Sequence, residues 1–197
     1  MTERNINILT FNANGIFRDH LNLQELLYRK NIDIALIQET KLPSNFNWKT
    51  PRYRTYYTQG PNHPHGGTAI LIKSNIQHTQ IQLQSLKNLQ ATGVLMFIDN
   101  TEIFIASVYQ PPHKRILRCD MDLLTTFKDT FIIGGDMNAK NIIWNSRVTN
   151  ARGRILEHHA ELLNYFITGP ATPTFFPNIT HHLPDVLDIF LYRVRNI

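Results

Sequence analysis

The chain has 197 residues, 42% of them hydrophobic, and a formal net charge of +5. This length suits one domain with a substantial core. No apolar run approaches the ~20 residues of a membrane-spanning helix, and the first residues lack the apolar stretch of a signal peptide. The single cysteine, Cys119, excludes an internal disulfide and fits a reducing compartment. Composition therefore predicts an intracellular globular protein with no membrane partner.

Five strand-like segments each deliver polar residues at or near one end. In chain order they are 6–11, followed by Asn12 and Asn14; 32–37, followed by Glu39; 103–108, followed by Tyr109; 131–133, followed by Asp136 and Asn138; and 186–191, which contains Asp188. Active sites on sheets of α/β proteins are often assembled outside strand ends. The ordered set therefore predicts that these side chains meet in one cleft.

The intervening segments indicate mixed secondary structure. Apolar residues at helical spacing predict helices near 23–27, 121–127 and 155–166. Further strands are expected at 68–72 and 93–98, the latter forming a hairpin with 102–108. The Pro-, Asn- and His-rich stretches 43–67 and 168–185 are expected to be long connections. This pattern predicts an α/β or α+β protein rather than a regular βαβ repeat.

Residues 131–139, Phe-Ile-Ile-Gly-Gly-Asp-Met-Asn-Ala, are the most informative stretch. Gly134 and Gly135 remove side chains where another backbone or a ligand must come close. In extended backbone, Asp136 and Asn138 project to the same side. The carboxylate can activate a water and the amide can donate to developing negative charge. The alternative is a strand that runs into an Asx-rich turn.

Charge is unevenly distributed along the chain. Residues 40–98 contain no Asp or Glu, but include Lys41, Arg52 and Arg54 interleaved with aromatic residues. A second acid-free stretch, 137–156, also carries several basic residues. Cations that neutralise phosphates and rings that stack on bases suit a nucleic acid. The alternative is an ordinary basic surface over core aromatics.

Taken together, the motifs resemble the endonuclease/exonuclease/phosphatase superfamily, and within it the apurinic-type endonuclease domain of jockey-like non-LTR retrotransposons. The matching pieces are Phe-Asn-Ala-Asn-Gly at 11–15, Gln-Glu-Thr at 38–40, Tyr-Gln-Pro-Pro at 109–112, Gly-Asp-Met-Asn-Ala at 135–139 with Trp144, and Pro-Asp-Val-Leu-Asp at 184–188. The resemblance implies two mixed β-sheets packed as a sandwich and flanked by helices, the four-layer DNase I-like fold.

The resemblance also implies roles for individual residues. Glu39 would be the principal ligand of Mg²⁺, with Mn²⁺ as the alternative ion, and Asn14 would lie in or near the metal shell. The implied catalytic residues are Asn12, which holds a phosphate oxygen or a neighbouring side chain, Tyr109, which hydrogen-bonds the scissile phosphate, Asp136, which positions or deprotonates water, Asn138, which donates to the phosphorane, and Asp188. We expect the DNA-binding residues to be Lys41, Arg52, Arg54, Lys140, Trp144 and Arg147.

The sequence departs from the family pattern in two places. Phe11 stands where family members carry Trp. The family also ends in a strand bearing Ser-Asp-His, whose histidine pairs with the acid equivalent to Asp188, and residues up to Ile197 contain no such motif. His181 and His182 are expected to be loop surface residues rather than replacements. We therefore expect one domain over residues 1–197 that stops before this motif and lacks one strand.

The function expected from this resemblance is metal-dependent nicking of DNA in the nucleus, by a domain that precedes a reverse transcriptase in the parent protein of a mobile element. One alternative is a catalytically impaired, nucleic-acid-binding remnant with the same surface. Another is a phosphatase of the superfamily acting on small phosphoesters. The basic, aromatic, acid-free stretch favours DNA over the phosphatase alternative.

Overall fold

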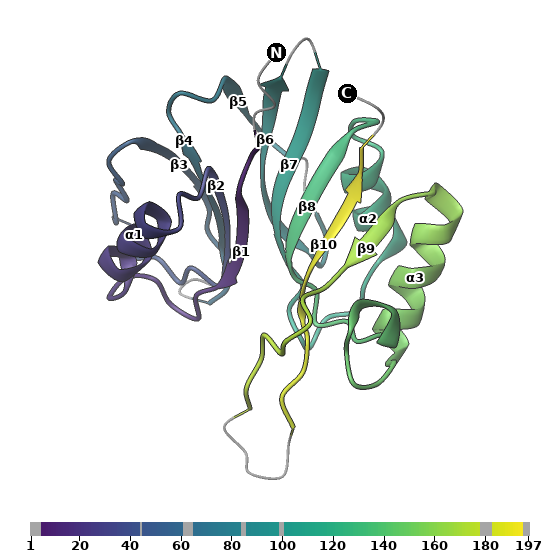
Figure 1. Cartoon of the computed structure of the whole chain (residues 1–197). Helices are drawn as coiled ribbons and strands as arrows, with labels where there is room; N and C mark the ends of the chain where they lie inside the picture. The colour runs from purple at the N-terminus through teal and green to yellow at the C-terminus, as the bar shows by residue number, and fades with distance from the viewer. Residues whose placement is uncertain are drawn as a thin grey trace.

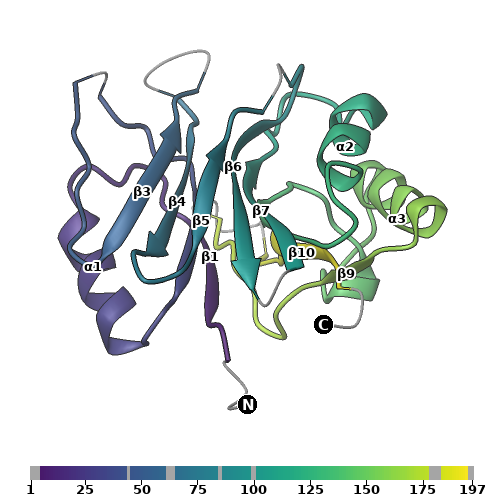
Figure 2. The ribbon, with the colours of Figure 1, turned by 90° about the horizontal axis from the view of Figure 1, so that it is seen from above.

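The computed structural model describes residues 5–43, 45–60, 65–83, 86–98, 101–177 and 183–194. Two β-sheets pack face to face, with one helix on the outer face of the first sheet and two on the outer face of the second (Figures 1 and 2). This four-layer arrangement confirms the predicted fold class. His181 and His182 lie outside the described residues. Within the described part, every helix is too short or too polar to cross a bilayer.

The first sheet is built from the N-terminal part of the chain in the order β1-β2-β4-β3. β1 and β2 are parallel, and the other two pairs are antiparallel. Its elements are β1 (Ile8–Asn12), α1 (His20–Arg29), β2 (Ile34–Gln38), β3 (Tyr53–Thr58) and β4 (Thr68–Lys73).

The second sheet has the order β5-β6-β7-β8-β10-β9. Among its described strands, β7 and β8 are parallel neighbours and the other pairs are antiparallel. The strands are β5 (His78–Ile81), β6 (Gln90–Ile98), β7 (Thr101–Tyr109), β8 (Phe131–Asp136), β9 (Phe166–Thr168) and β10 (Asp188–Arg193). The associated helices are α2 (Arg118–Thr125), the 3₁₀ turn η1 (Ile142–Trp144) and α3 (Ala151–Leu163).

β2 shows how the apolar pattern produces the layers. All five of its residues are buried. Because side chains alternate between faces, Ile34 and Leu36 belong to the core between the sheets, whereas Ala35 and Ile37 pack with Leu27 of α1. A strand covered on both faces reads as a continuous apolar run, which is what this segment shows.

Strand register carries the polar strand ends to one end of the sandwich. Asn12 pairs with Gln38 across β1 and β2. In the second sheet, Asp136 at the end of β8 lies opposite both Tyr109 of β7 and Asp188 of β10. The fold therefore delivers chemically active side chains that are distant in sequence to one place.

Three local expectations need correction. The third helix ends at Leu163, because Asn164 adopts a left-handed conformation with φ of 52°, and Phe166 begins β9 instead. The stretch 43–67 is not only a connection, since it contains β3, whose aromatic and threonine residues favour strands. β5 was not predicted, because its residues His-Thr-Gln-Ile lack a clear apolar pattern.

Candidate active site

All seven residues predicted to be catalytic or metal-binding line one pocket of about 470 Å³. They are Asn12, Asn14, Glu39, Tyr109, Asp136, Asn138 and Asp188. The prediction that they meet in one cleft is therefore confirmed, although they come from both sheets and span most of the chain. Their individual roles remain predictions.

Asn12 links the two sheets through its side-chain amide. Nδ2 donates to Glu39 Oε1 at 2.9 Å and to Asp136 Oδ2 at 2.8 Å. Its Oδ1 accepts from the backbone N–H of Asn14 at 3.0 Å. These contacts agree with one of the two roles implied for Asn12, that of holding neighbouring side chains, and its role in catalysis stays a prediction. The amide fixes the distance between the predicted metal ligand and the predicted base.

Glu39 is presented by strained backbone. Glu39 and Lys41 both have a φ of 47°, a left-handed conformation that is uncommon for residues other than Gly and Asn. Neighbouring segments hold it in place: Gly15 N–H donates to Glu39 O at 2.8 Å, and Lys41 N–H donates to Gly66 O at 2.9 Å. Such strain persists only where the surroundings impose it, and it is frequent at functional sites.

The two predicted metal ligands already converge on a cation. The Lys41 ammonium lies 3.1 Å from Glu39 Oε2 and also hydrogen-bonds Asn14 Oδ1. The two oxygens are thus close enough to be shared by one positive charge. Within the described residues, Lys41 is thus a predicted DNA-binding residue that contacts the predicted metal ligands directly.

Asp136 is a buried carboxylate with both oxygens held. It is 5% exposed, accepts from Asn12 through Oδ2, and accepts the Asn138 N–H through Oδ1 at 2.9 Å. Burial is the main cause that raises its pKa to about 7, and the charge of Asp188 adds to it, while the hydrogen bonds from Asn138 and Asn12 oppose the rise. A carboxylate that titrates near neutrality is suited to exchange protons with water.

The glycines before Asp136 let β8 pack closely. A Cβ on Gly135 would lie 1.8 Å from the carbonyl oxygen of Val108 in β7, and one on Gly134 would lie 2.7 Å from Leu36 and Phe190. The expectation that these glycines allow close approach is therefore confirmed. The approach brings Asp136 level with Tyr109 and Asp188.

Tyr109 and Asp188 complete the acidic side of the pocket. Burial, together with the charges of Glu39 and Asp136, raises the pKa of Tyr109, so its hydroxyl stays protonated and can donate. Burial is also the main cause that raises the pKa of Asp188, opposed by a hydrogen bond from Thr174. In the described part of the chain, Oδ1 of Asp188 is buried and has no hydrogen-bond partner.

Asn138 is tied to residues that sequence reasoning missed. Its Nδ2 donates to Gln110 O at 3.0 Å, which uses one of the two amide hydrogens and leaves the second. Arg152 Nη1 donates to Asn138 O at 3.4 Å. Gln110 lies inside the Tyr-Gln-Pro-Pro motif, which could have pointed to it. Arg152 belongs to none of the motifs, so nothing in the sequence pointed to it. Thr174, whose Oγ1 accepts the Asp188 N–H at 3.1 Å, was also missed.

The structure corrects the assignment of Trp144 to the DNA-binding set. Trp144 is 1% exposed, and its Nε1 donates to Ala139 O at 3.2 Å inside the core. A buried ring cannot stack on a base. The presence of Trp144 in the motif therefore reflects packing under the active site rather than contact with a ligand.

Arg52 and Arg54 lie away from the pocket. The site end of the first sheet is marked by Thr58, which pairs with Thr68, whereas Arg54 pairs with Ile72. Arg54 lies four positions before Thr58 along β3, a distance of roughly 13 Å. The Arg52 guanidinium lies over the Tyr28 ring, 5.7 Å from its centroid. The structure does not bring these two arginines to the site.

Lys140 and Arg147 are both anchored on Asp185. Lys140 Nζ lies 2.9 Å from Asp185 Oδ2, and the Arg147 N–H donates to Asp185 Oδ1 at 2.9 Å. Hydrogen bonds from these neighbours and from Val186 lower the pKa of Asp185 against the effect of its burial. The Arg147 side chain remains exposed. The Lys140 ammonium is therefore already paired with a buried carboxylate that precedes β10.

Two packed sheets thus gather carboxylates, amides and a phenol at one end, an arrangement that suits a hydrolase. The sequence pattern of the Endonuclease/Exonuclease/phosphatase family matches residues 9–196. The chain belongs to this family, as its motifs predicted. By family it is a hydrolase domain of the nuclease and phosphatase type, and dependence on a divalent metal ion is general for the family.

The sequence relatives are proteins of mobile elements. The chain is 28% identical over 202 residues to the RNA-directed DNA polymerase from mobile element jockey of Drosophila funebris, which covers 100% of this chain and 22% of the relative. It is 26% identical over 192 residues to the probable RNA-directed DNA polymerase from transposon BS of Drosophila melanogaster, covering 95% of this chain and 21% of the relative. The chain thus spans about a fifth of the length of these relatives.

Solved structures share the fold. The endonuclease domain of TRAS1, a telomere-specific non-LTR retrotransposon, superposes with a TM-score of 0.78 at 22% identity, over 95% of this chain and 85% of that one. The AP endonuclease LMAP from Leishmania major gives a TM-score of 0.70 at 14% identity, over 95% and 78%. These likenesses confirm the sandwich architecture.

The residues present fit a single divalent cation with few protein ligands. Among the described residues, no three His, Cys, Asp or Glu side chains are grouped as a metal site. One carboxylate and one amide oxygen, Glu39 Oε2 and Asn14 Oδ1, do converge on the Lys41 ammonium. Oxygen ligands of this kind suit a hard cation that keeps most of its waters.

Proposed function

We propose that the domain cleaves one strand of DNA by metal-dependent hydrolysis of a phosphodiester bond. The observation that carries the proposal is Asp136, a buried carboxylate with a pKa of about 7 and both oxygens oriented by hydrogen bonds. A phosphodiester is anionic and resists nucleophiles, so cleavage needs an activated water and compensation of charge. The pocket offers groups for both.

In this mechanism, Asp136 takes a proton from the attacking water as the water oxygen bonds to phosphorus. The P–O bond to the leaving end of the strand breaks, and that leaving oxygen takes up a proton from solvent. Asn12 and the Asn138 N–H keep its carboxylate from rotating, so the basic oxygen faces one position. The protonated Tyr109 hydroxyl donates to a phosphate oxygen, and the second amide hydrogen of Asn138 donates to the charge that develops during attack. Each of these groups is held before the substrate arrives, which lowers the cost of reorganisation.

Glu39 and Asn14 would hold the metal ion, which supplies neutralisation of phosphate charge when bound. We propose Mg²⁺, because both ligands are oxygens and the ligand number is small; Mn²⁺ prefers similar ligands. The Lys41 ammonium contacts the same two oxygens in this structure, so the ion would take its place there. Titration with Mg²⁺ and with Mn²⁺ distinguishes the two ions.

The relatives named above are RNA-directed DNA polymerases of mobile elements. This supports the proposal that the domain works together with a reverse transcriptase in a longer parent protein, and that its DNA substrate is chromosomal. Action on chromosomal DNA would take place in the nucleus, which fractionation of cells expressing the tagged parent protein would test.

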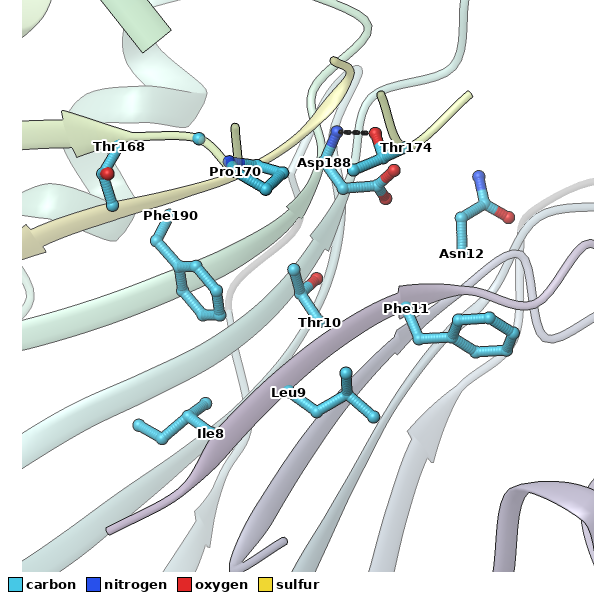
Figure 3. Close-up of a pocket in the computed structure, with 11 residues that line it drawn as sticks. Ile8, Leu9, Thr10, Phe11, Asn12, Thr168, Pro170, Thr174, Asp188 and Phe190 are labelled. Carbon is cyan, nitrogen blue, oxygen red and sulfur yellow. Dashed lines mark hydrogen bonds between the residues drawn. The ribbon is translucent and has the colours of Figure 1, made fainter. Parts of the chain in front are cut away.

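We also propose that a further β-strand completes the site beside β1. Within the described residues β1 is the edge of its sheet. A groove of about 590 Å³ runs between β1 and the start of β10, past Ile8, Thr10 and Phe190 to Asn12 and Asp188 (Figure 3). A strand here would cover an exposed edge, and a donor on it, such as the histidine of Ser-Asp-His, would satisfy Asp188 Oδ1.

A direct test of completion appends a Ser-Asp-His-bearing segment to the chain. We expect a higher melting temperature and faster nicking, because a positioned acid–base group is worth about 10²–10⁴ in rate. Replacing only the histidine of the appended segment by Ala should keep most of the added stability and lose the added rate. Equal nicking rates with and without the segment would refute the proposal.

The proposed function is tested by conversion of supercoiled plasmid to open circles in Mg²⁺, with EDTA and Asp136→Asn as controls. Metal-dependent nicking that Asp136→Asn removes supports the proposal. DNA binding without nicking, even in the appended chain, would favour the nucleic-acid-binding remnant. Faster turnover of small phosphomonoesters than of plasmid would favour a phosphatase instead.

A further inference from the structure

A second, basic pocket adjoins the candidate active site. Its volume is about 230 Å³, and it shares Glu39, Tyr109 and Pro112 with the catalytic pocket. Its other lining residues are mainly basic or polar: Lys41, His65, Gly66, Gln90, Pro111, His113 and Lys114. The wall formed by Tyr109 and Pro112 therefore faces a catalytic pocket on one side and a cationic pocket on the other.

The turn that carries His113 and Lys114 is fixed by three sets of hydrogen bonds. Lys114 N–H donates to Pro111 O at 3.1 Å. Gln110 Nε2 donates to the carbonyl oxygens of Pro111 and Lys114, each at 3.1 Å. Arg152 Nη2 donates to Lys114 O at 2.8 Å and also hydrogen-bonds Pro112 O. The backbone that carries both side chains is thus held in place, although the turn lies on the surface.

The same contacts join this turn to the catalytic residues. Arg152 also donates to Asn138 O, and Gln110 O accepts from Asn138 Nδ2. Both side chains that hold the turn therefore belong to residues that position Asn138. A ligand that touches the turn would lie at a defined place relative to the predicted phosphorane donor.

Charge in the basic pocket is not balanced by the protein. In the part of the chain that the structure describes, the side chains of His113 and Lys114 form no hydrogen bond or ion pair. The one acid that lines the pocket, Glu39, is engaged by Lys41 and Asn12. An anion is the ligand that this arrangement suits.

We infer that the basic pocket binds a second phosphate of the nucleic-acid strand, next to the one held in the catalytic pocket. This inference rests on the proposed function and deepens it. A polymer can place one phosphate on each side of Tyr109, whereas a small phosphomonoester can occupy only one of the two pockets. The second pocket therefore gives the domain a preference for polynucleotides over small phosphoesters.

The test measures how DNA affinity depends on salt. Duplex binding is followed by fluorescence anisotropy in EDTA over a range of salt concentrations, for the wild-type chain and for Lys114→Gln and Lys114→Met, the second of which retains an apolar stem. Loss of one phosphate contact lowers the slope of log K against log salt by about 0.9. We expect this lower slope in both variants. Lys114→Arg keeps the positive charge and should therefore show the wild-type slope.

Arg29→Gln is the matched control. Arg29 is exposed in the last turn of α1, and the chain continues from there into the start of β2, which is the end of that strand remote from the site. Its slope should equal that of the wild type. Equal slopes for Lys114→Gln, Lys114→Met and Arg29→Gln, with a salt-sensitive wild type, would overturn the second phosphate site and leave the proposed function standing. A wild-type chain without salt-sensitive affinity would overturn both.

Discussion

Replacing Asp136 by Asn should stabilise the fold at neutral and alkaline pH while it removes catalysis. The pKa of Asp136 rises from 3.8 in the unfolded chain to about 7 in the folded one, mainly through burial. The folded state then binds the proton more tightly than the unfolded state, so wild-type stability falls as pH rises from about 4 to about 7. A shift of this size corresponds to about 4 kcal/mol above pH 7.

The asparagine of the Asp136→Asn variant would carry no charge, so this cost disappears in the variant. One hydrogen bond is lost, because the amide cannot accept both from Asn12 and from the Asn138 N–H, and this costs about 1 kcal/mol at any pH. The free energy of unfolding of the variant should therefore be about 3 kcal/mol higher than that of the wild type at pH 8. Between pH 5 and pH 8 the difference should widen by about 2–3 kcal/mol.

Urea denaturation at pH 5, 6, 7 and 8 in EDTA measures this difference directly, because other titrating groups are common to both proteins and largely cancel. The charge of Asp188, which lies across the strand pair, is one cause of the raised pKa of Asp136, so this repulsion is already part of the expected difference. A stability difference that stays constant from pH 5 to pH 8 would refute the account of Asp136 as a desolvated carboxylate.

Three further outcomes follow from the site and its surroundings. Glu39→Gln should weaken Mg²⁺ or Mn²⁺ binding by at least about tenfold in calorimetric titration, while Asp136→Asn retains it; equal losses would contradict the separation of ligand from base. Trp144→Ala should cost about 3–5 kcal/mol in urea denaturation, because a buried ring leaves a cavity, and a cost below about 1 kcal/mol would argue against its burial. Arg52→Gln combined with Arg54→Gln should leave the salt dependence of DNA affinity unchanged, since both lie at the far end of the first sheet; a flatter slope would place DNA there.

The fold could be predicted where the sequence pattern was local. Apolar runs with polar ends gave β1, β2, β7, β8 and β10, and these strands hold the site. β3 and β5 were missed because their stability comes from pairing with β4 and β6 rather than from an apolar run. β9, three residues long, owes its existence to β10, which pairs with it.

The predicted site residues were found through motifs. The motifs could not show whether each side chain faces the pocket or lies away from it. Arg52 and Lys41 belong to the same acid-free stretch, yet register sends one to the far end of the sheet and the other to the pocket. Trp144 shares a motif with Asp136, but its ring packs beneath the site. A motif records which residues a site requires, whether they touch the ligand or support those that do.

Residues that act on the site from a distance left even less trace in the sequence. Arg152 is one arginine among several in α3 and its surroundings, and only the folded chain shows that its guanidinium joins the 111–114 turn to Asn138. The left-handed backbone at Glu39 has the same origin, because Gly15 and the Gly66–Gly67 turn impose it through hydrogen bonds from other segments. Asn12 then couples the Glu39 carboxylate to Asp136 of the other sheet. Relaxation of one sheet against the other would therefore separate the metal ligand from the base, so the packing between the sheets is itself a requirement of the chemistry proposed for this site.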